Sequence, residues 1–253
     1  MQDDKQTSLL HRAVELWKQS RFPIAFTGAG ISVASGIPDF RSPGGLWSKY
    51  DPMKVATGEA LRTNPQAVWE FLMETADLLQ SCDPNTGHIA LAKLEEEYGL
   101  QGVITQNVDN LHQRAGSKEV VEYHGNFERF YCQKCGEKEE PEKVQEKVKK
   151  TIPPYCDKCN SFIRPDVVFF GEAIPAYAMQ KSRELTRKAD LILITGTSGE
   201  VSPANTIPRE VKMNGGKIIE INKGMTYYHD ISDIRFDNPA EDILPQFVQL
   251  LSQ

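Results

Sequence analysis

The sequence predicts an α/β fold, in which a Rossmann-like doubly wound parallel sheet carries a smaller inserted domain. Apolar runs such as Phe22–Thr27 and Asp190–Thr195 alternate with amphipathic segments, which is the pattern of parallel strands joined by helices. A glycine-rich turn follows the first run, as in folds that bind nucleotides. Two C-x-x-C pairs, at 132–135 and 156–159, interrupt the alternation. We therefore expect the inserted domain to combine a zinc-binding module with a helical module.

Length and composition narrow the choice of partners. The chain has 253 residues, of which 40% are hydrophobic, which suits one large domain with an insert. Its net charge of -6 argues against nucleic acid or an anionic membrane as the main partner. No apolar run approaches about 18 residues, and the acidic N-terminal segment lacks the features of a signal peptide. We expect a soluble protein located in the cytoplasm.

The N-terminal third is expected to hold a helix, a strand and a helical module. Apolar residues at helical spacing predict a first helix over 8–18, ahead of the strand Phe22–Thr27. A second helix is predicted at Pro65–Gln80, within the segment 43–84. This module can cover a binding site or serve only as a packing layer, and we favour the cover.

The turn after the first strand reads TGAGISVASGIPDFR, from Thr27 to Arg41. Gly28 and Gly30 allow a pyrophosphate to approach the backbone, and an acid, an aromatic ring and a cation follow at 39–41. Val33 occupies the third glycine position of the usual G-x-G-x-x-G pattern, so a simple tight turn is the alternative. The three residues at 39–41 favour a binding site, because the loop that carries them shows little apolar periodicity and so has few side chains to bury.

A second wall of the site is expected after the next strand. Asn85 caps a predicted helix that ends at Gly99, and the predicted strand Gly102–Gln106 follows. The segment TQNVDNLH at 105–112 then lies at the edge where open parallel sheets bind ligands. Capping of the next helix would explain a lone amide there, but it explains less well an amide and a carboxylate two residues apart.

A histidine follows the short predicted strand Val120–Tyr123. His124 precedes a glycine, at the end of that strand. An imidazole at this place can be structural or can act as a general base, because its unperturbed pKa lies near neutral pH.

Four of the five cysteines form the two C-x-x-C pairs: Cys132, Cys135, Cys156 and Cys159. In a reducing compartment, two such knuckles supply four thiolates to one tetrahedral zinc ion, and paired redox motifs are the alternative. The segment 137–150 is almost entirely charged, so we expect a solvated surface helix or loop there. Cys82 is interpreted as an isolated, partly buried thiol.

The C-terminal half returns to alternating strands and helices. The predicted elements are the strand Val167–Phe170, the helix Tyr177–Lys188, the strand Asp190–Thr195, a helix from Pro203, the strand Lys217–Ile221 and a helix over 240–251. Small residues after one strand, Gly196, Thr197 and Ser198, suit contacts with phosphate or ribose, as does Asn222 after another.

Seven motifs occur in order along nearly the whole chain: GAGIS, GIPDFR, TQN-x-D, YHG, the paired C-x-x-C, VVFFGE and GTS. Together they resemble the sirtuins, which are NAD-dependent protein-lysine deacylases. The resemblance implies a Rossmann-like domain made of residues 1–42, 85–130 and 166–253, and a small domain made of 43–84 and 131–165. NAD and an extended acyl-lysine peptide would bind between the two, with the peptide added as a strand.

The resemblance also assigns residues to the site. It implies NAD contacts at Gly28, Ala29, Gly30, Ile31, Asp39, Phe40, Arg41, Gln106, Asn107, Val108, Asp109, His124, Gly196, Thr197, Ser198, Asn222 and Ala240. It implies acyl-lysine contacts at Val168, Phe170, Gly171 and Glu172, and one structural zinc ion on the four paired cysteines. His124, Asn107 and Asp109 would be the catalytic residues, with Asp109 accepting from the nicotinamide carboxamide.

The implied reaction transfers the acyl group from lysine to ADP-ribose. The acyl oxygen attacks C1′ of the ribose as nicotinamide leaves, and Phe40 would shield this carbon from water. His124 then takes a proton from the ribose hydroxyls, and the 2′-oxygen attacks the imidate carbon. Free lysine and 2′-O-acyl-ADP-ribose result. Two other functions stay open: transfer of ADP-ribose to a protein side chain or to water, and binding of NAD or acyl-lysine without catalysis.

Three departures from the family pattern bear on specificity. Ser42 stands where the family commonly has glycine, and Gly199–Ser202 replaces a more apolar run. Leu72 and Thr75 occupy the places where desuccinylating relatives carry Tyr and Arg. Without a cation at these places, we expect removal of acetyl, and of longer apolar chains as a further possibility, rather than of succinyl.

Overall fold

The computed structural model of this chain describes residues 2–40 and 44–253. Within them, the strands are β1 (Pro23–Thr27), β2 (Val103–Thr105), β3 (Val120–Glu122), β4 (Gly125–Cys132), β5 (Lys138–Glu139), β6 (Ile163–Val167), β7 (Leu191–Thr195), β8 (Lys217–Ile221) and β9 (Ile234–Phe236). The helices are α1 (Gln2–Gln19), the 3₁₀ helix η1 (Ala29–Ser35), α2 (Leu46–Lys49), α3 (Pro52–Val55), α4 (Gly58–Thr63), α5 (Pro65–Gln80), α6 (Thr86–Glu97), α7 (Leu111–Arg114), α8 (Pro141–Val148), α9 (Ala176–Lys188), α10 (Thr206–Met213) and α11 (Ala240–Leu251).

The larger sheet is parallel and has the strand order β3-β2-β1-β7-β8-β9. The chain runs from β1 outward to β2 and β3 and then returns to β7 on the other side of β1. In the ladder, Thr27 pairs with Thr105 of β2 and with Thr195 of β7. The carboxyl ends of these three strands therefore meet at one edge of the sheet. This is the strand order of Rossmann-like folds, and it confirms the predicted fold class.

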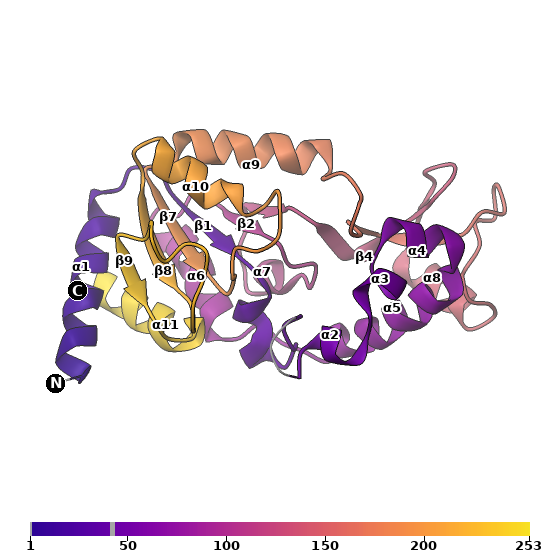
Figure 1. Cartoon of the computed structure of the whole chain (residues 1–253), viewed down its shortest axis with the longest axis horizontal. Coiled ribbons are helices and arrows are strands. Elements are labelled where there is room, and N and C mark those ends of the chain that lie inside the picture. Colours follow the sequence, from indigo (N-terminus) through magenta and orange to yellow (C-terminus); the bar gives the residue numbers. More distant parts are fainter. Residues whose placement is uncertain (1, 41–43) are drawn as a thin grey trace.

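Helices cover both faces of this sheet (Figure 1). α1, α6 and α11 pack against one face, in a core that includes Trp17, Leu91 and Phe247. α9 and α10 pack against the other face, where Leu185 and Val211 are buried. All 5 residues of β7 are buried, which explains why this strand is a continuous apolar run in the sequence. Of the helices in the described residues, none has the length and apolar character needed to cross a bilayer.

A second sheet, with the order β5-β4-β6, is antiparallel and lies at the other end of the molecule from α1 (Figure 1). Residues of α4, α5, α8, β4 and β6 share a separate core, to which Leu61, Trp69 and Ile163 contribute. The indole Nε1 of Trp69 donates to the Ile163 carbonyl at 3.0 Å and so joins α5 to β6. In the charged segment predicted as solvated, α8 exposes most of its charged residues but buries Val144 in this core.

Most predicted elements agree with the structure, and two differ. The predicted strand Val167–Phe170 is wrong: β6 ends at Val167, where its pairing with β4 ends, and Phe170 instead donates its amide to the Ala56 carbonyl at 2.9 Å. The helix predicted from Pro203 begins only at Thr206, after a turn in which Thr206 donates to the Pro203 carbonyl. Strand β9 was not predicted, because its sequence, Ile-Arg-Phe, has a charged residue at its centre and forms no apolar run.

Candidate active site

The loops after β1 and β7 touch at the carboxyl edge of the sheet, where the strand order reverses. The amide of Gly30 donates to the Gly196 carbonyl at 2.8 Å. A Cβ on Gly28 would lie 2.8 Å from the Cβ of Thr197, and one on Gly196, which has a φ of +66°, would lie 2.2 Å from the amide nitrogen of Ile31. Glycine is therefore required here by the contact between the loops. That contact brings the NAD residues predicted on both loops together.

Asn107 and Asp109 follow β2, and both bind the side chain of Ser32 in η1. The Ser32 hydroxyl donates to Asp109 Oδ2 at 2.7 Å and accepts from Asn107 Nδ2 at 3.1 Å. Asn107 Nδ2 also lies 3.2 Å from the Gly28 carbonyl, and Asp109 Oδ1 accepts from the amide of Leu111 at 3.0 Å. The side chains of Asn107, Asp109 and Ser32 are all buried. One hydroxyl thus fixes the orientation of the predicted amide and carboxylate.

Two buried histidines lie next to this hydroxyl. His88 Nε2 is 3.4 Å from Ser32 Oγ, and His88 Nδ1 accepts from the amide of Asn85 at 3.3 Å. Because Nδ1 accepts, the proton of the neutral ring is on Nε2, which donates to Ser32. His112 Nε2 is 2.9 Å from Thr27 Oγ1, and its ring packs edge-on against His88. Burial lowers the pKa of His88 to about 4 and that of His112 to about 3, so both rings are neutral at pH 7.

His124 lies between β3 and β4, close to the loop after β2. Its Nδ1 is 3.0 Å from the carbonyl oxygen of Gln106. A carbonyl oxygen only accepts, so Nδ1 carries the proton of the neutral ring and Nε2 keeps its lone pair. Burial lowers the pKa of His124, while the hydrogen bond to Gln106 acts in the opposite direction. The ring is therefore neutral at pH 7, and its Nε2 can take a proton, which is what a general base requires.

Gln106 connects the loops after β2 and β7. Its Nε2 donates to Thr197 Oγ1 at 2.9 Å, while its carbonyl oxygen orients His124. Thr197 in turn donates its amide to Asn222 Oδ1, after β8, at 2.9 Å. Val108, two residues after Gln106, packs against the core of the second sheet. The predicted residues after β2, β7 and β8 are thus joined by direct hydrogen bonds.

Phe40 lies in the loop between η1 and α2 and belongs to a row of aromatic rings. Its side chain is 38% exposed and stacks on Trp47, with 5.1 Å between the ring centroids. The Trp47 ring lies 6.4 Å from that of Phe170. The row therefore connects Phe40, the predicted shield of the reacting carbon, to Phe170, which is predicted to contact the acyl-lysine. Arg41 and Ser42 lie outside the described residues.

The predicted acyl-lysine contacts follow β6: Val168, Phe170, Gly171 and Glu172. Val168 donates its amide to the His124 carbonyl at 2.9 Å, which places the start of this segment beside the imidazole. Phe170 is exposed, and Gly171 has a φ of 84°. The carboxylate of Glu172 accepts from Arg164 at 2.6 Å and 2.7 Å, and from the amide of Phe169 at 3.0 Å. Glu172 thus holds the segment in place by binding Arg164, a residue that is only 4% exposed.

The remaining predicted NAD residues lie around the same edge in different surroundings. Ile31 is fully buried, and both of its backbone groups are hydrogen-bonded within the chain. Ala240 is buried at the start of α11, and the carbonyl of Asp39 accepts from the amide that begins α2. Ala29 and Ser198 are partly exposed beside the contact between the two loops. Direct contact of these residues with NAD stays a prediction.

The four paired cysteines form two similar turns. Gly136 donates its amide to the Cys132 carbonyl at 3.0 Å, and Asn160 donates to the Cys156 carbonyl at 2.9 Å. The four Sγ atoms lie within 4.8 Å of one another, two of the pairs at 3.4 Å and 3.7 Å. The sulfurs around a tetrahedral zinc ion are about 3.8 Å apart, so the cluster fits one ion. A bulge between Asn126 and Phe130 shortens β4, whose end residues Gly125 and Cys132 pair with Val167 and Ile163, four positions or about 13 Å apart. The cysteines therefore lie at the end of β4 opposite to His124, which suits a structural metal.

Two surface cavities lie away from the predicted site residues. Surface cavities of about 550 Å³ and about 450 Å³ lie beside α9 and α1, and none of the predicted site residues lines them. The site is instead marked by polar side chains that converge from the loops after β1, β2, β3 and β7.

Comparisons with known proteins agree with this geometry. The model of the Sir2 family matches residues 28–203. This chain belongs to the Sir2 family. A relative from Thermococcus kodakarensis, named an NAD-dependent protein deacylase, is 44% identical over 244 residues, which cover 95% of each chain. One from Sulfurisphaera tokodaii, named an NAD-dependent protein deacetylase, is 45% identical over 238 residues and 94% of each chain. A solved structure of Sir2 with a p53 peptide and NAD+ has a TM-score of 0.88 and 38% identity, covering 94% of this chain and 97% of that one.

Reasoning from the sequence of this Sir2 family member missed the roles of three residues. Ser32 lies inside the GAGIS motif, but a serine in a glycine-rich turn has many explanations. His88 gave a usable signal, since it lies three residues before the buried Leu91 and therefore on the apolar face of α6. Arg164 gave none, because its pairing with Glu172 depends on how the chain turns after β6.

Proposed function

We propose that this chain is an NAD-dependent protein-lysine deacylase that moves an acetyl group from lysine to ADP-ribose. The products are nicotinamide, 2′-O-acyl-ADP-ribose and free lysine. Membership of the Sir2 family and the names of its relatives support this activity. The observation that carries it is the orientation of His124: its Nδ1 is bound by the Gln106 carbonyl, one residue before Asn107, which leaves Nε2 able to accept a proton.

The proposed chemistry divides the work among three groups of residues. Asn107 and Asp109, held by Ser32, bind the nicotinamide carboxamide and place its ring for departure. The touching loops after β1 and β7 bind the pyrophosphate and ribose of NAD. His124 then takes a proton from the ribose hydroxyls. Positioning is the main contribution, since well-oriented reactants can gain about 7 to 11 kcal/mol over free ones.

We propose that the acyl-lysine lies along the segment Val168–Glu172, which begins at the hydrogen bond to His124. The peptide would enter as a strand between a domain built on the parallel sheet and a smaller domain built on the antiparallel sheet. The separate core of the smaller part supports this division. The strand β4 crosses the expected boundary between residues 130 and 131, so the two domains share a continuous strand.

The four paired cysteines hold one structural zinc ion in this proposal. Four thiolates complete a tetrahedral shell, so no position is left for substrate. Free thiolates that bind metal rather than form disulfides are typical of reducing compartments, which supports a location in the cytoplasm.

The test measures nicotinamide release from NAD with and without an acetyl-lysine peptide. The proposal expects release that requires the peptide and yields deacetylated peptide in equal amount. In His124→Ala, turnover should stop while NAD still binds. His11→Ala, which changes an exposed histidine on α1, serves as the control and should keep full activity. Release that ignores the peptide would indicate NAD hydrolysis, ADP-ribose attached to protein would indicate a transferase, and binding without turnover would indicate a binding module.

A further inference from the structure

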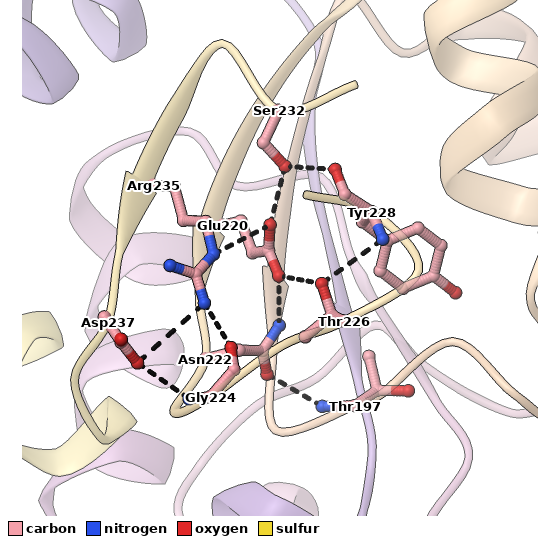
Figure 2. A network of polar contacts seen from close by, with 9 residues as sticks. All are labelled: Thr197, Glu220, Asn222, Gly224, Thr226, Tyr228, Ser232, Arg235 and Asp237. Carbon is pink, nitrogen blue, oxygen red and sulfur yellow. Dashed lines mark hydrogen bonds and ion pairs between the residues drawn. The ribbon is translucent and has the colours of Figure 1, made fainter. Parts of the chain in front are cut away.

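A network of polar contacts lies at the end of β8 (Figure 2). It contains Glu220, a residue to which the sequence assigned no role. Its centre is the side-chain amide of Asn222. Asn222 Oδ1 accepts from the amide of Thr197 at 2.9 Å, and Asn222 Nδ2 donates to Glu220 Oε1 at 3.1 Å. The amide group is thus bound at both of its ends. One end holds the loop after β7, and the other is held by a carboxylate.

Glu220 is a fully buried carboxylate in β8, where it lies among Ile218, Ile219 and Ile221. Side chains two residues apart point to the same face of a strand, which is why Glu220 lies beside Asn222. The hydroxyl of Thr226 also donates to Oε1, while Ser232 donates to Oε2 at 2.8 Å. The guanidinium Nε of Arg235, on β9, lies 3.7 Å from Oε2.

The same network orders the loop that follows β8. Thr226 Oγ1, which donates to Glu220, accepts from the amide of Tyr228 at 3.2 Å. The amide of Gly224 donates to Asp237 Oδ1 at 2.7 Å, and Arg235 donates to the Gly224 carbonyl. As Figure 2 shows, the contacts of Glu220 therefore reach both the loop after β7, through Asn222, and the loop after β8, through Thr226.

Stability alone is a poor explanation for a carboxylate at this place. Removing a carboxylate from water costs several kcal/mol, and well-packed apolar residues of similar volume are often as stable as a buried ion pair or more so. What an apolar side chain cannot do is choose one orientation of the neighbouring amide. Without an acceptor at position 220, the Asn222 amide can turn by 180°. Its Nδ2 would then face the Thr197 amide, donor against donor, and the loop would have to move.

We propose that Glu220 is a positioning residue for NAD, which acts by fixing the orientation of Asn222 and, through it, the loop Gly196–Ser198. This inference rests on the proposed function, in which that loop binds the pyrophosphate and ribose of NAD, and on the NAD contact that the family resemblance implies for Asn222. A preformed loop raises affinity, because the conformational entropy lost in ordering it no longer reduces the free energy of binding. Glu220 itself does not touch the dinucleotide.

The first test is Glu220→Met, which keeps the length of the side chain and removes the acceptor. We expect the dissociation constant for ADP-ribose, measured by calorimetry, and the KM for NAD to rise about tenfold, the effect of losing one charge-assisted hydrogen bond. The kcat and the KM for acetyl-peptide should change less than about threefold. If Glu220 has only a structural role, the variant should have a lower melting temperature, but its KM for NAD should not rise more than its KM for acetyl-peptide. Thr186→Val, which removes a buried hydroxyl on α9, is the control for stability loss without loss of affinity.

The second test exchanges donor and acceptor and does not depend on Glu220→Met folding. In Asn222→Asp, two carboxylates face each other and ADP-ribose binding should weaken about tenfold or more. In E220Q/N222D, the new amide donates to the new carboxylate, and binding should recover at least about fivefold relative to N222D alone.

Two results would overturn the proposal: folded E220M that binds ADP-ribose within about twofold of the unchanged chain, or E220Q/N222D that binds no better than N222D. If the unchanged chain binds neither ADP-ribose nor NAD, the proposed function itself fails, and this inference fails with it.

Discussion

The ion pair between Arg164 and Glu172 predicts how the segment after β6 is held. The Arg164 side chain is 5% exposed and that of Glu172 is 26% exposed, and the two share a pair of short hydrogen bonds. Glu172→Gln keeps the shape but leaves a buried guanidinium facing a neutral amide. Breaking a buried pair costs about 3 to 5 kcal/mol, and the oxygen retained by glutamine reduces this to about 2 to 3 kcal/mol. For a chain of this length, the melting temperature should fall by about 5 to 10 °C.

The pH dependence of this effect has a definite sign. Burial alone raises the pKa of Glu172, but the hydrogen bonds from Arg164 and the Phe169 amide outweigh it, and the pKa lies below its ordinary value of 4.5. The folded state therefore binds a proton less readily than the unfolded state. The stabilisation by the ion pair is fully present above pH 4.5 and is lost as the pH falls through the lower pKa of the folded state. The gap between the melting curves of the two proteins should be constant near pH 7 and narrow below pH 4.5.

The same variant should affect one substrate and spare the other. If the segment Val168–Glu172 binds acyl-lysine, the KM for acetyl-peptide should rise roughly fivefold or more, about 1 kcal/mol, while the KM for NAD stays within about twofold. Glu119→Gln is the matched control, since the ion pair of Glu119 with Lys181 is exposed and contributes at most about 1 kcal/mol. Glu172→Gln with an unchanged melting temperature at pH 7 and an unchanged peptide KM would refute the argument.

Three further predictions concern the base, the metal and the acyl group. Burial lowers the pKa of His124, so the acid limb of kcat/KM should have its midpoint below pH 6.5 and should be missing from any residual rate of His124→Ala; a midpoint above 6.5 would contradict the buried geometry. Removing zinc with a chelator, or Cys156→Ser, should unfold the part of the chain around the second sheet and lower activity about tenfold or more, as followed by zinc release and near-ultraviolet circular dichroism, and a chelated protein with unchanged activity and spectrum would disprove the structural role. Leu72 is buried in an apolar core, and the Thr75 hydroxyl is bound to the Phe71 carbonyl. Neither side chain is a cation that could bind a succinyl carboxylate, so acetyl-peptide should react about tenfold faster or more than a matched succinyl-peptide. Faster succinyl removal would show that another residue binds the carboxylate.

The parts of the fold that depend on local pattern were predictable from the sequence. The helix bounds of α5 and α11 agree with prediction, because apolar spacing and flanking turn residues define them. The cap of α6 at Asn85 also agrees, and the structure adds the reciprocal bond to His88. Strand β6 was misplaced because its limits are set by pairing with β4, more than thirty residues earlier in the chain. Local pattern carries no information about such a partner.

The candidate site divides in the same way. Residues that follow strands, such as Asn107 and His124, could be chosen from the sequence because parallel strands end at one edge. The residues that hold these side chains in place could not be chosen in this way. Ser32 meets Asp109 across 77 positions of sequence, and the role of Glu220 depends on an asparagine that itself bonds to another loop. The sequence predicts which groups reach the edge, while packing decides how each one is oriented.

The hydrogen bond from Val168 to the His124 carbonyl joins the beginning of β4 to the end of β6. Because these two strands are paired antiparallel neighbours, the imidazole and the segment that follows β6 belong to one rigid ribbon. His124 is also attached to the parallel sheet, because its Nδ1 is bound to the Gln106 carbonyl after β2 and Gln106 Nε2 donates to Thr197 after β7. The residue therefore connects the two sheets, and a rotation of one sheet against the other would have to break one of its two attachments.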